Sequence, residues 1–512
     1  MTWDEASIGY NAYSILKTGA DEYGNKLPLS FRSFDDFKPP VYIYLTVPFV
    51  AVFGLNELSV RLPAAIIGVL AVIAVYYLVK EIFINWESEK KEQVALLSAF
   101  LLAISPWHLQ FSRAAFEGNI GMFFLILAVF AFFKALHDKR FFILFAAGFV
   151  LSLYSYHSFR LINPIILAVL VLLHYKELLK QKTVVALSLA AIVLFSFPVY
   201  QSFFISQGTS ARLSMVTIFS DPEIQRISAE KVLEAKQNDD FLGQIIYNRR
   251  IVFIPNVVAG YLDHFNFDFL FLHGDSGVQH HAYNMGMLYL WEFPFILLGL
   301  WFLFKKIDKR IATLLIIFFL APLPSAITTG TPHPVRAIAM IPAFHIFTAV
   351  GIVYFLELIK KRTKPAVAVI SLLLLINLGY YLYSYYVLTP AKYGYFWQYG
   401  NKEAVMYAKE HENEYEKIIM TYEYDQPYIY YLFHNKIDPF WYQKNWNYSG
   451  NGEVDRFFRK IGKYEFKRVD FAKDLQPKTL IIAAPKEVPE EINAQKLIYF
   501  PDGSIAYKII GI

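Results

Sequence analysis

Long apolar stretches alternate with short polar connections over most of the first 390 residues. About 20 consecutive apolar residues cross a bilayer as a helix, so these stretches predict membrane-spanning helices. Ten are expected, at 59–83, 93–110, 118–136, 141–158, 161–176, 183–203, 286–304, 310–327, 334–357 and 365–387. The stretch 39–54 is also apolar, but it is short and Pro48 interrupts it, which favours an interfacial or re-entrant segment.

The pattern changes after residue 388, where long apolar stretches stop and charges become frequent. The segments 415–424 and 478–485 are typical of strands, and 402–417 and 426–435 are typical of helices. The sequence therefore predicts a membrane domain over 1–387 and a small α/β domain over 388–512. The fold class is a polytopic α-helical membrane protein.

Composition agrees with a membrane protein. Hydrophobic residues make up 56% of the 512 residues and charged residues only 18%. The net charge of +5 requires no nucleic-acid partner, and the absence of Cys excludes disulfides and thiolate chemistry. The basic residues are better explained as topology signals.

The distribution of Lys and Arg predicts an orientation. The connections at 80–92, 134–140, 176–182, 305–310 and 360–364 carry 3, 3, 3, 4 and 4 basic residues. The alternate short connections carry one Arg each: Arg113, Arg160 and Arg336. The positive-inside rule assigns the first set to the cytoplasm. The first loop (1–58), the long loop 204–285 and the domain 388–512 are then expected outside.

This orientation requires the helix at 59–83 to run from outside to inside. An outer N-terminal segment with no helix before it is unusual in a polytopic protein. We therefore expect one further helix before Met1 in the natural protein, and a true N-out protein is the alternative.

Charged and imidazole side chains from five segments gather at the predicted outer surface, a pattern that fits a site for an anionic, membrane-embedded substrate. They are Asp4, Glu5 and Lys38; Arg113 and Glu117; His157 and Arg160; Asp275, His280 and His281; and His333 and Arg336. Each also has a simpler explanation. An acidic pair near a terminus is usually solvated, boundary arginines snorkel, and adjacent histidines are more often structural than metal ligands.

The order of these motifs resembles the lipid-linked-sugar glycosyltransferases of the GT-C class, specifically glycosyltransferase family 39. The matching pieces are "WDEASIGYNAYSIL", "FKPPVYIYL", "FGLNELSVRLPAAIIG" and "SPWHLQFSRAAFEGN", with "FLHGDSGVQHHAYNMGMLYLWEFPFILLGL" further on. Each piece alone is a weak signal. Four in this order, on the same predicted side, are a strong one. The resemblance extends over most of residues 1–390.

The resemblance implies roles for individual residues. The family's Asp–Glu pair after its first helix matches Asp4 and Glu5, which implies Asp4 as general base and supports the helix expected before Met1. The lysine before paired prolines matches Lys38. The acid of the second outer loop matches Glu117, although Asp is more usual there. Some members bind a divalent metal, and Phe37 stands where an acid might supply a ligand, so metal dependence is open.

The implied reaction moves a sugar from a polyprenyl phosphate to an acceptor hydroxyl with inversion, at the outer face of the cell membrane. The departing phosphate gains charge, and fixed cations would stabilise it. The candidates are Lys38, Arg113, Arg160 and Arg336. Candidates for binding substrate are His157, Asp275, His280, His281 and His333. The acceptor could be a protein, a glycolipid or a cell-wall polymer.

Three other functions compete with this one. A transporter or lipid flippase would place ionisable groups near the bilayer midplane and show two related halves, whereas here the charges lie at one surface. The second alternative is an oligosaccharyltransferase or polysaccharide ligase, and the oligosaccharyltransferase signature "WWDYG" is absent from the predicted outer domain. An inactive sensor on the same scaffold would be favoured by loss of Asp4 or Lys38, and both are present.

Overall fold

The computed structural model describes residues 1–512 except 35, 206–216, 250 and 447–456. The predicted outer loop at 204–285 therefore lies partly outside the described residues. The chain forms two compact units. The first contains residues 1–66, 113–115 and 382–512, and the second contains residues 67–112 and 116–381. Helix α3 (Glu57–Ile82) begins in the first unit and continues in the second.

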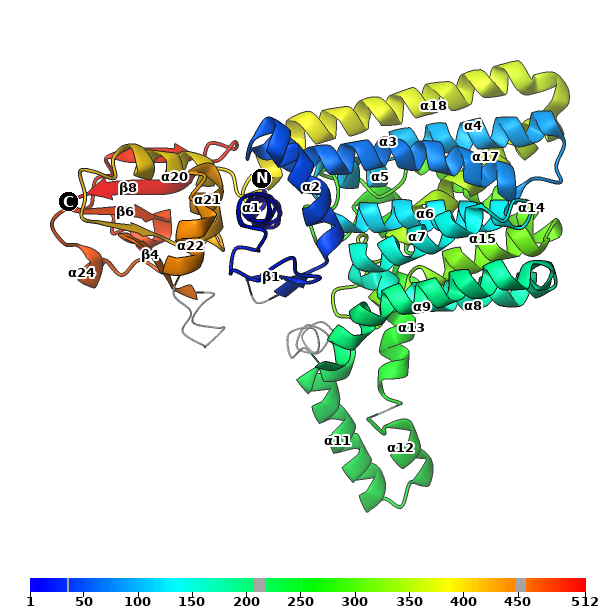
Figure 1. Ribbon diagram of the computed structural model, residues 1–512, viewed down its shortest axis with the longest axis horizontal. Helices are drawn as coiled ribbons and strands as arrows, with labels where there is room; N and C mark the ends of the chain where they lie inside the picture. Colours follow the sequence, from blue (N-terminus) through cyan, green and yellow to red (C-terminus); the bar gives the residue numbers. More distant parts are fainter. Residues whose placement is uncertain (35, 206–216, 250, 447–456) are drawn as a thin grey trace. The chain divides into compact units, whose positions relative to one another are not determined.

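The second unit is almost entirely helical (Figure 1). Its first helices after α3 are α4 (Ser88–Ile104), α5 (Pro106–Arg113), α6 (Glu117–Ala135), α7 (Phe141–Ser155), α8 (His157–Leu178) and α9 (Lys182–Ile205). Between α9 and α14 the chain forms α11 (Pro222–Gln237), α12 (Phe241–Ile246) and α13 (Phe253–Asp263). The unit continues with α14 (Phe293–Lys305), α15 (Lys309–Leu320), α16 (Leu323–Ala326), α17 (Ile341–Ile359) and α18 (Thr363–Tyr383).

Each of the ten apolar stretches predicted to span the membrane contains a helix. Among the described residues, six helical stretches are long and apolar enough to cross a bilayer, or seven if the bent pair α4 and α5 is one span. One of the six, His157–Gln201, includes two of the predicted spans, while α7 is a shorter apolar helix. The chain is therefore a multi-pass helical membrane protein, as predicted, with six or seven spans of this length where ten were expected.

Ion pairs join the basic connections of the second unit. Lys134 and Arg310 both bind Glu81, at 3.4 and 3.2 Å. The remaining pairs are Lys80–Glu92 at 2.9 Å, Lys309–Glu177 at 2.8 Å and Lys90–Glu357 at 2.6 Å. The connections predicted to share the cytoplasmic side therefore lie together at one end of this unit.

The N-terminal part of the first unit is built around α1 (Trp3–Thr18). It is followed by the hairpin of β1 (Phe31–Ser33) and β2 (Asp36–Lys38) and by α2 (Pro40–Phe53), which packs against α1. Gly9 makes close packing possible, because a Cβ at this position would lie 2.4 Å from Phe433 and 2.6 Å from Val60. Helix α1 can therefore approach the start of α3 and the C-terminal domain at once.

The C-terminal domain, which Figure 1 shows as a sheet with helices packed beside it, has a six-stranded mixed sheet. Its strand order is β4-β5-β3-β6-β8-β7. The strands are β3 (Lys417–Met420), β4 (Arg459–Ile461), β5 (Tyr464–Phe466), β6 (Thr479–Ala483), β7 (Lys496–Tyr499) and β8 (Ile505–Gly511). The helices are α19 (Thr389–Tyr393), α20 (Asn401–Glu410), α21 (Pro427–His434), α22 (Pro439–Asn445) and α24 (Phe471–Asp474). Strand β3 runs parallel to both neighbours, and the other pairs are antiparallel. The predicted α/β domain is confirmed.

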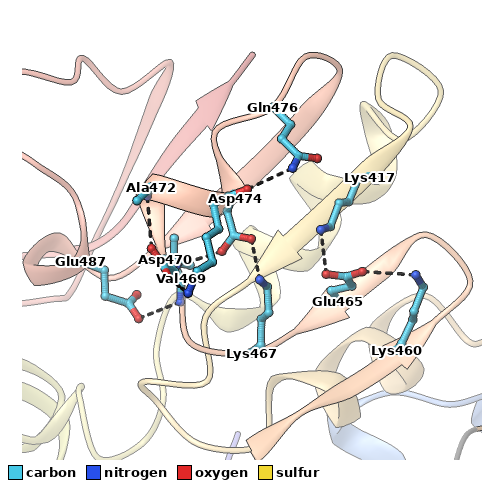
Figure 2. Close-up of polar contacts among 11 residues, drawn as sticks. Lys417, Lys460, Glu465, Lys467, Val469, Asp470, Ala472, Asp474, Gln476 and Glu487 are labelled. Carbon is cyan, nitrogen blue, oxygen red and sulfur yellow. Dashed lines mark hydrogen bonds and ion pairs between the residues drawn. The ribbon is translucent and has the colours of Figure 1, made fainter.

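Charge pairs reinforce the register at one side of this sheet, as Figure 2 shows. Glu465 on β5 accepts from Lys417 on β3 at 2.9 Å and from Lys460 on β4 at 3.2 Å. Lys460 lies directly opposite Glu465 in the antiparallel pair, where unlike charges stabilise a sheet. Nearby, Lys467 donates to the buried carboxylate of Asp474 at 2.5 Å.

Glu22 is a fully buried carboxyl in the first unit. Its Oε1 accepts from Asn11 Nδ2 at 3.2 Å, and its Oε2 has no hydrogen-bond partner within the described part of the chain. Burial raises the pKa of Glu22 to about 7, although Arg459 and the Asn11 hydrogen bond oppose the shift. The folded unit therefore holds this proton to a higher pH than the unfolded chain does.

We predict that the unit loses stability as the pH rises from 4.5 to about 7, because the Glu22 carboxyl of the unfolded chain ionises at a lower pH than that of the folded unit. The Glu22→Gln variant should lack this loss and gain about 3 kcal/mol above pH 7. Thermal unfolding of the purified protein between pH 5 and 8 measures the effect. Glu414→Gln, at an exposed carboxylate, is the control, and parallel pH profiles for the Glu22 variant and the wild type would contradict the prediction.

Candidate active site

The first turn of α1 presents Asp4 and Glu5 in different environments. Thr2 caps the helix: its Oγ1 accepts from the Glu5 amide at 3.3 Å, and the Glu5 carboxylate accepts from the Thr2 amide at 3.0 Å. This capping box fixes the start of α1. It turns Glu5 into the protein, where its side chain is 2% exposed, while the side chain of Asp4 is 52% exposed.

Asp4 forms an ion pair with Lys38, and Lys38 Nζ donates to Asp4 Oδ1. Lys38 is the last residue of β2, and Pro40 follows at the first position of α2, where the fixed φ of proline suits a helix start. The lysine side chain is 8% exposed. An accessible carboxylate and a nearly buried ammonium therefore lie side by side, from two motifs that are 34 residues apart.

Glu5 binds Arg61, a residue that sequence reasoning missed. Arg61 Nε and Nη2 donate to the two carboxylate oxygens at 2.6 and 2.8 Å, and the Ala115 amide donates to Oε1 at 3.3 Å. Burial alone would raise the pKa of Glu5, but the Arg61 hydrogen bonds and charge outweigh it and hold that pKa below its usual range. Its position in the first turns of an apolar helix was the signal that could have marked Arg61 as a functional candidate, because a charge there is costly unless it is paired.

These contacts give Asp4 and Glu5, which are adjacent in the sequence, different environments and partners. Glu5 accepts hydrogen bonds from two backbone amides and a bidentate arginine, so its carboxylate is engaged in holding α1 to α3. Asp4 keeps an exposed carboxylate on the same turn. The geometry favours Asp4 over Glu5 as a group that could reach a substrate.

Arg113 also belongs to the first unit. Its guanidinium lies 4.8 Å from the ring centre of Tyr385 and 5.3 Å from that of Tyr386, and Nη1 donates to the Tyr386 hydroxyl at 3.0 Å. Stacking on two aromatic rings stabilises a cation while leaving its edge available. This predicted phosphate ligand is thus an exposed cation on an aromatic support.

The second unit brings together four of the predicted substrate-binding residues. His280 Nδ1 lies 2.7 Å from Asp275 Oδ2, and His281 Nε2 lies 3.0 Å from the Asp275 carbonyl oxygen. The ring centres of His280 and His333 are 4.9 Å apart. Burial, helped by the Arg336 charge, holds the pKa of His333 well below its usual range, so this ring is neutral at pH 7.

The remaining candidates of the second unit make contacts of their own. Arg160 Nη1 is 3.1 Å from His157 Nδ1, and Arg160 Nε donates to the Leu153 carbonyl at 3.3 Å. Arg336 donates to Thr328 Oγ1 at 2.6 Å and to the Thr329 carbonyl at 2.9 Å. Glu117 begins α6, where a carboxylate is favoured by the helix dipole.

Metal ligation was left open by the sequence. Within the described ranges, no group of three or more His, Asp or Glu side chains is arranged to hold a metal ion. We therefore assign no metal site and derive no step through a metal.

The helical second unit and the C-terminal mixed sheet define a multi-pass membrane protein with an ArnT-like fold. The structure of ArnT from Cupriavidus metallidurans bound to undecaprenyl phosphate matches with a TM-score of 0.53 and 11% identity, covering 99% of this chain and 93% of that one. Apo ArnT matches with a TM-score of 0.51 and 11% identity, covering 94% and 88%. At this identity the likeness shows the fold alone.

A comparison with models of protein families finds a match to part of the chain. Residues 37–200 match the model of the family described as dolichyl-phosphate-mannose-protein mannosyltransferase. The predicted glycosyltransferase resemblance is thus confirmed over that segment. A curated relative from Bacillus subtilis (strain 168), named "Putative mannosyltransferase YkcB", is 29% identical over 163 residues. That match covers 29% of this chain and 22% of the relative.

Proposed function

We propose that this chain is a membrane glycosyltransferase that moves a sugar from a polyprenyl-phosphate donor to an acceptor hydroxyl on the extracytoplasmic side. The observation that carries the proposal is the ion pair of Asp4 with Lys38 in a chain whose residues 37–200 match a mannosyltransferase family. The match to ArnT, which was solved with undecaprenyl phosphate, supports a polyprenyl-phosphate donor.

In the proposed reaction, Asp4 accepts the proton of the acceptor hydroxyl, and the hydroxyl oxygen attacks the anomeric carbon of the donor. The bond from that carbon to the phosphate oxygen breaks, and polyprenyl phosphate leaves with the bonding electron pair. A positioned carboxylate suits the first task, and a fixed ammonium such as Lys38 suits the negative charge that develops on the phosphate. A single displacement of this kind inverts the anomeric centre.

The other roles are proposals of the same kind. Arg113, Arg160 and Arg336 are offered as further phosphate ligands, and Glu117 as an additional catalytic carboxylate. The cluster of Asp275, His280, His281 and His333, with His157, is offered for substrate binding. The close pairing of His280 with Asp275 supports the cluster, because a carboxylate fixes which imidazole nitrogen faces a ligand.

The direct test uses the purified full chain in lipid and a panel of polyprenyl-phosphate sugars. Release of free polyprenyl phosphate and a mass increase of one sugar on a membrane-fraction acceptor are expected for at least one donor. Mannose is the first sugar to test because of the family match. Export of intact lipid-linked sugar without cleavage would favour the flippase alternative and contradict the proposal.

The proposed orientation, with up to ten spans, predicts opposite accessibility for two exposed serines of the second unit. A single Cys at Ser88 should react only from the cytoplasmic side, and one at Ser276 only from the outer side. Membrane-impermeant thiol labelling of intact cells and inverted vesicles measures this, and the Cys-free wild type is the blank. Labelling of both positions from the same side would contradict the orientation.

A further inference from the structure

The first unit contains a cavity of about 500 Å³ that the proposed chemistry does not use. It lies where residues 398–410, at and before α20, face the end of α21 and Lys496 of β7. This volume is within the range of pockets that hold small ligands. All of its lining residues belong to this one unit.

Aromatic rings form part of the wall. Tyr399 is 56% exposed, Tyr430 is buried, and Tyr407 lies between them in exposure. Flat aromatic faces pack well against the C–H faces of sugar rings, because both surfaces are apolar and rigid. The rings also lose little conformational entropy when they bind a ligand.

The charges on the wall are largely compensated. Lys402 binds Glu57 at 2.7 Å, and Lys496 binds Glu403 at 3.0 Å. Glu410 adds a further carboxylate to the lining. Met1 also lines the cavity with its amino group, so the carboxylates and amines of the lining nearly balance and hydrogen bonding is the main polar interaction left for a ligand.

His434 supplies neutral hydrogen-bonding groups. Its ring stacks against Tyr430 with an interplanar angle of 11°. Burial, with a smaller contribution from Lys402, lowers the pKa of His434 to about 4, so the ring is neutral at pH 7. A neutral imidazole offers one donor and one acceptor, and sugar hydroxyls can satisfy both.

The cavity wall is connected to the first turn of α1. Gln398, which is buried, accepts from the Trp3 amide at 2.9 Å and from the Tyr430 hydroxyl. Its amide donates to the Tyr424 carbonyl at 3.0 Å. The residue after Trp3 is Asp4, so a ligand in the cavity would be held by the same part of the unit that carries the candidate base.

We propose that this cavity binds an uncharged saccharide that is part of the acceptor. The inference rests on the proposed function and extends it, because it names the acceptor as a neutral glycan rather than a bare peptide hydroxyl. Aromatic faces, compensated charges and a neutral imidazole together match hydroxyl-rich, uncharged rings better than phosphate or carboxylate ligands.

The test measures binding of three neutral trisaccharides, mannotriose, cellotriose and N,N′,N″-triacetylchitotriose, to the full chain in lipid nanodiscs by titration calorimetry and saturation-transfer NMR. At least one should bind. Tyr399→Ala and His434→Phe should weaken that binding about tenfold, because each removes one ring contact or one pair of hydrogen-bonding atoms. Tyr499→Ala, an exposed tyrosine outside the cavity, is the matched control and should bind normally.

Two results overturn the inference: no binding of any trisaccharide to the wild type, or equal binding by the wild type and both cavity variants. Cleavage of the donor is measured separately, as release of polyprenyl phosphate. Normal donor cleavage without saccharide binding would reject the cavity site and leave the proposed function standing. Saccharide binding without cleavage of any donor would reject the proposed function and leave the cavity site standing.

Discussion

Replacing Asp4 with Asn is expected to lower the transfer rate by about 10²–10⁴-fold while the protein inserts and binds donor lipid normally. The amide keeps the size and polarity of the side chain but cannot accept the acceptor's proton. Because Asp4 is 52% exposed, the change should have little effect on thermal stability. The measurement is a single-turnover transfer assay at saturating donor, with thermal unfolding recorded in parallel.

The control is Asp138→Asn, which alters a carboxylate that also pairs with a cation, Arg140, but lies on a basic connection of the second unit. It should transfer at the native rate. Lys38→Ala should differ from both by weakening donor binding as well as turnover, since the phosphate is negative before and after reaction. Near-native transfer by Asp4→Asn would exclude it as the base, and Glu117 would be the next carboxylate to test.

Replacing Glu5 with Gln should instead destabilise the first unit by about 3 kcal/mol. The change leaves the Arg61 guanidinium, which is 34% exposed, without its bidentate partner. It also weakens the helix cap, since Gln can still accept from the Thr2 amide but carries no charge. Thermal unfolding and expression level measure the loss.

The double variant Glu5→Gln with Arg61→Met is the matched control for this effect. It removes the unpaired charge together with its partner, so part of the lost stability should return. A Glu5→Gln protein that is as stable as wild type but inactive would show that Glu5 acts on substrate rather than holding α1 to α3.

The sequence was sufficient to predict the elements whose signal is local. Each of the ten apolar stretches contains a helix, because burying apolar side chains in a bilayer requires hydrogen bonds within the segment itself. Strands β3 and β6 and helices α20 and α21 form within segments that were predicted as strands and helices. Strands β4, β5 and β7 were missed, because strands of three or four residues with exposed charged residues such as Lys460 become stable only through pairing with a neighbour. Strand β8, with seven residues, was also missed.

Motif order also allowed the sequence to single out Asp4 and Lys38, and the resemblance implied Asp4 as the base, but spacing alone could not show which of the two acids is buried and paired. That distinction depends on Arg61, which lies 56 residues from Glu5 and reaches it only when α3 packs beside α1. The same is true of the His280 and His333 rings, which come from different loops. Local pattern determined which segments are helices, which end of the second unit is basic, and which residues are candidates for carrying chemistry. Tertiary packing decided which charges are paired and buried and which stay accessible, because ion pairing depends on distances in space that no sequence spacing specifies.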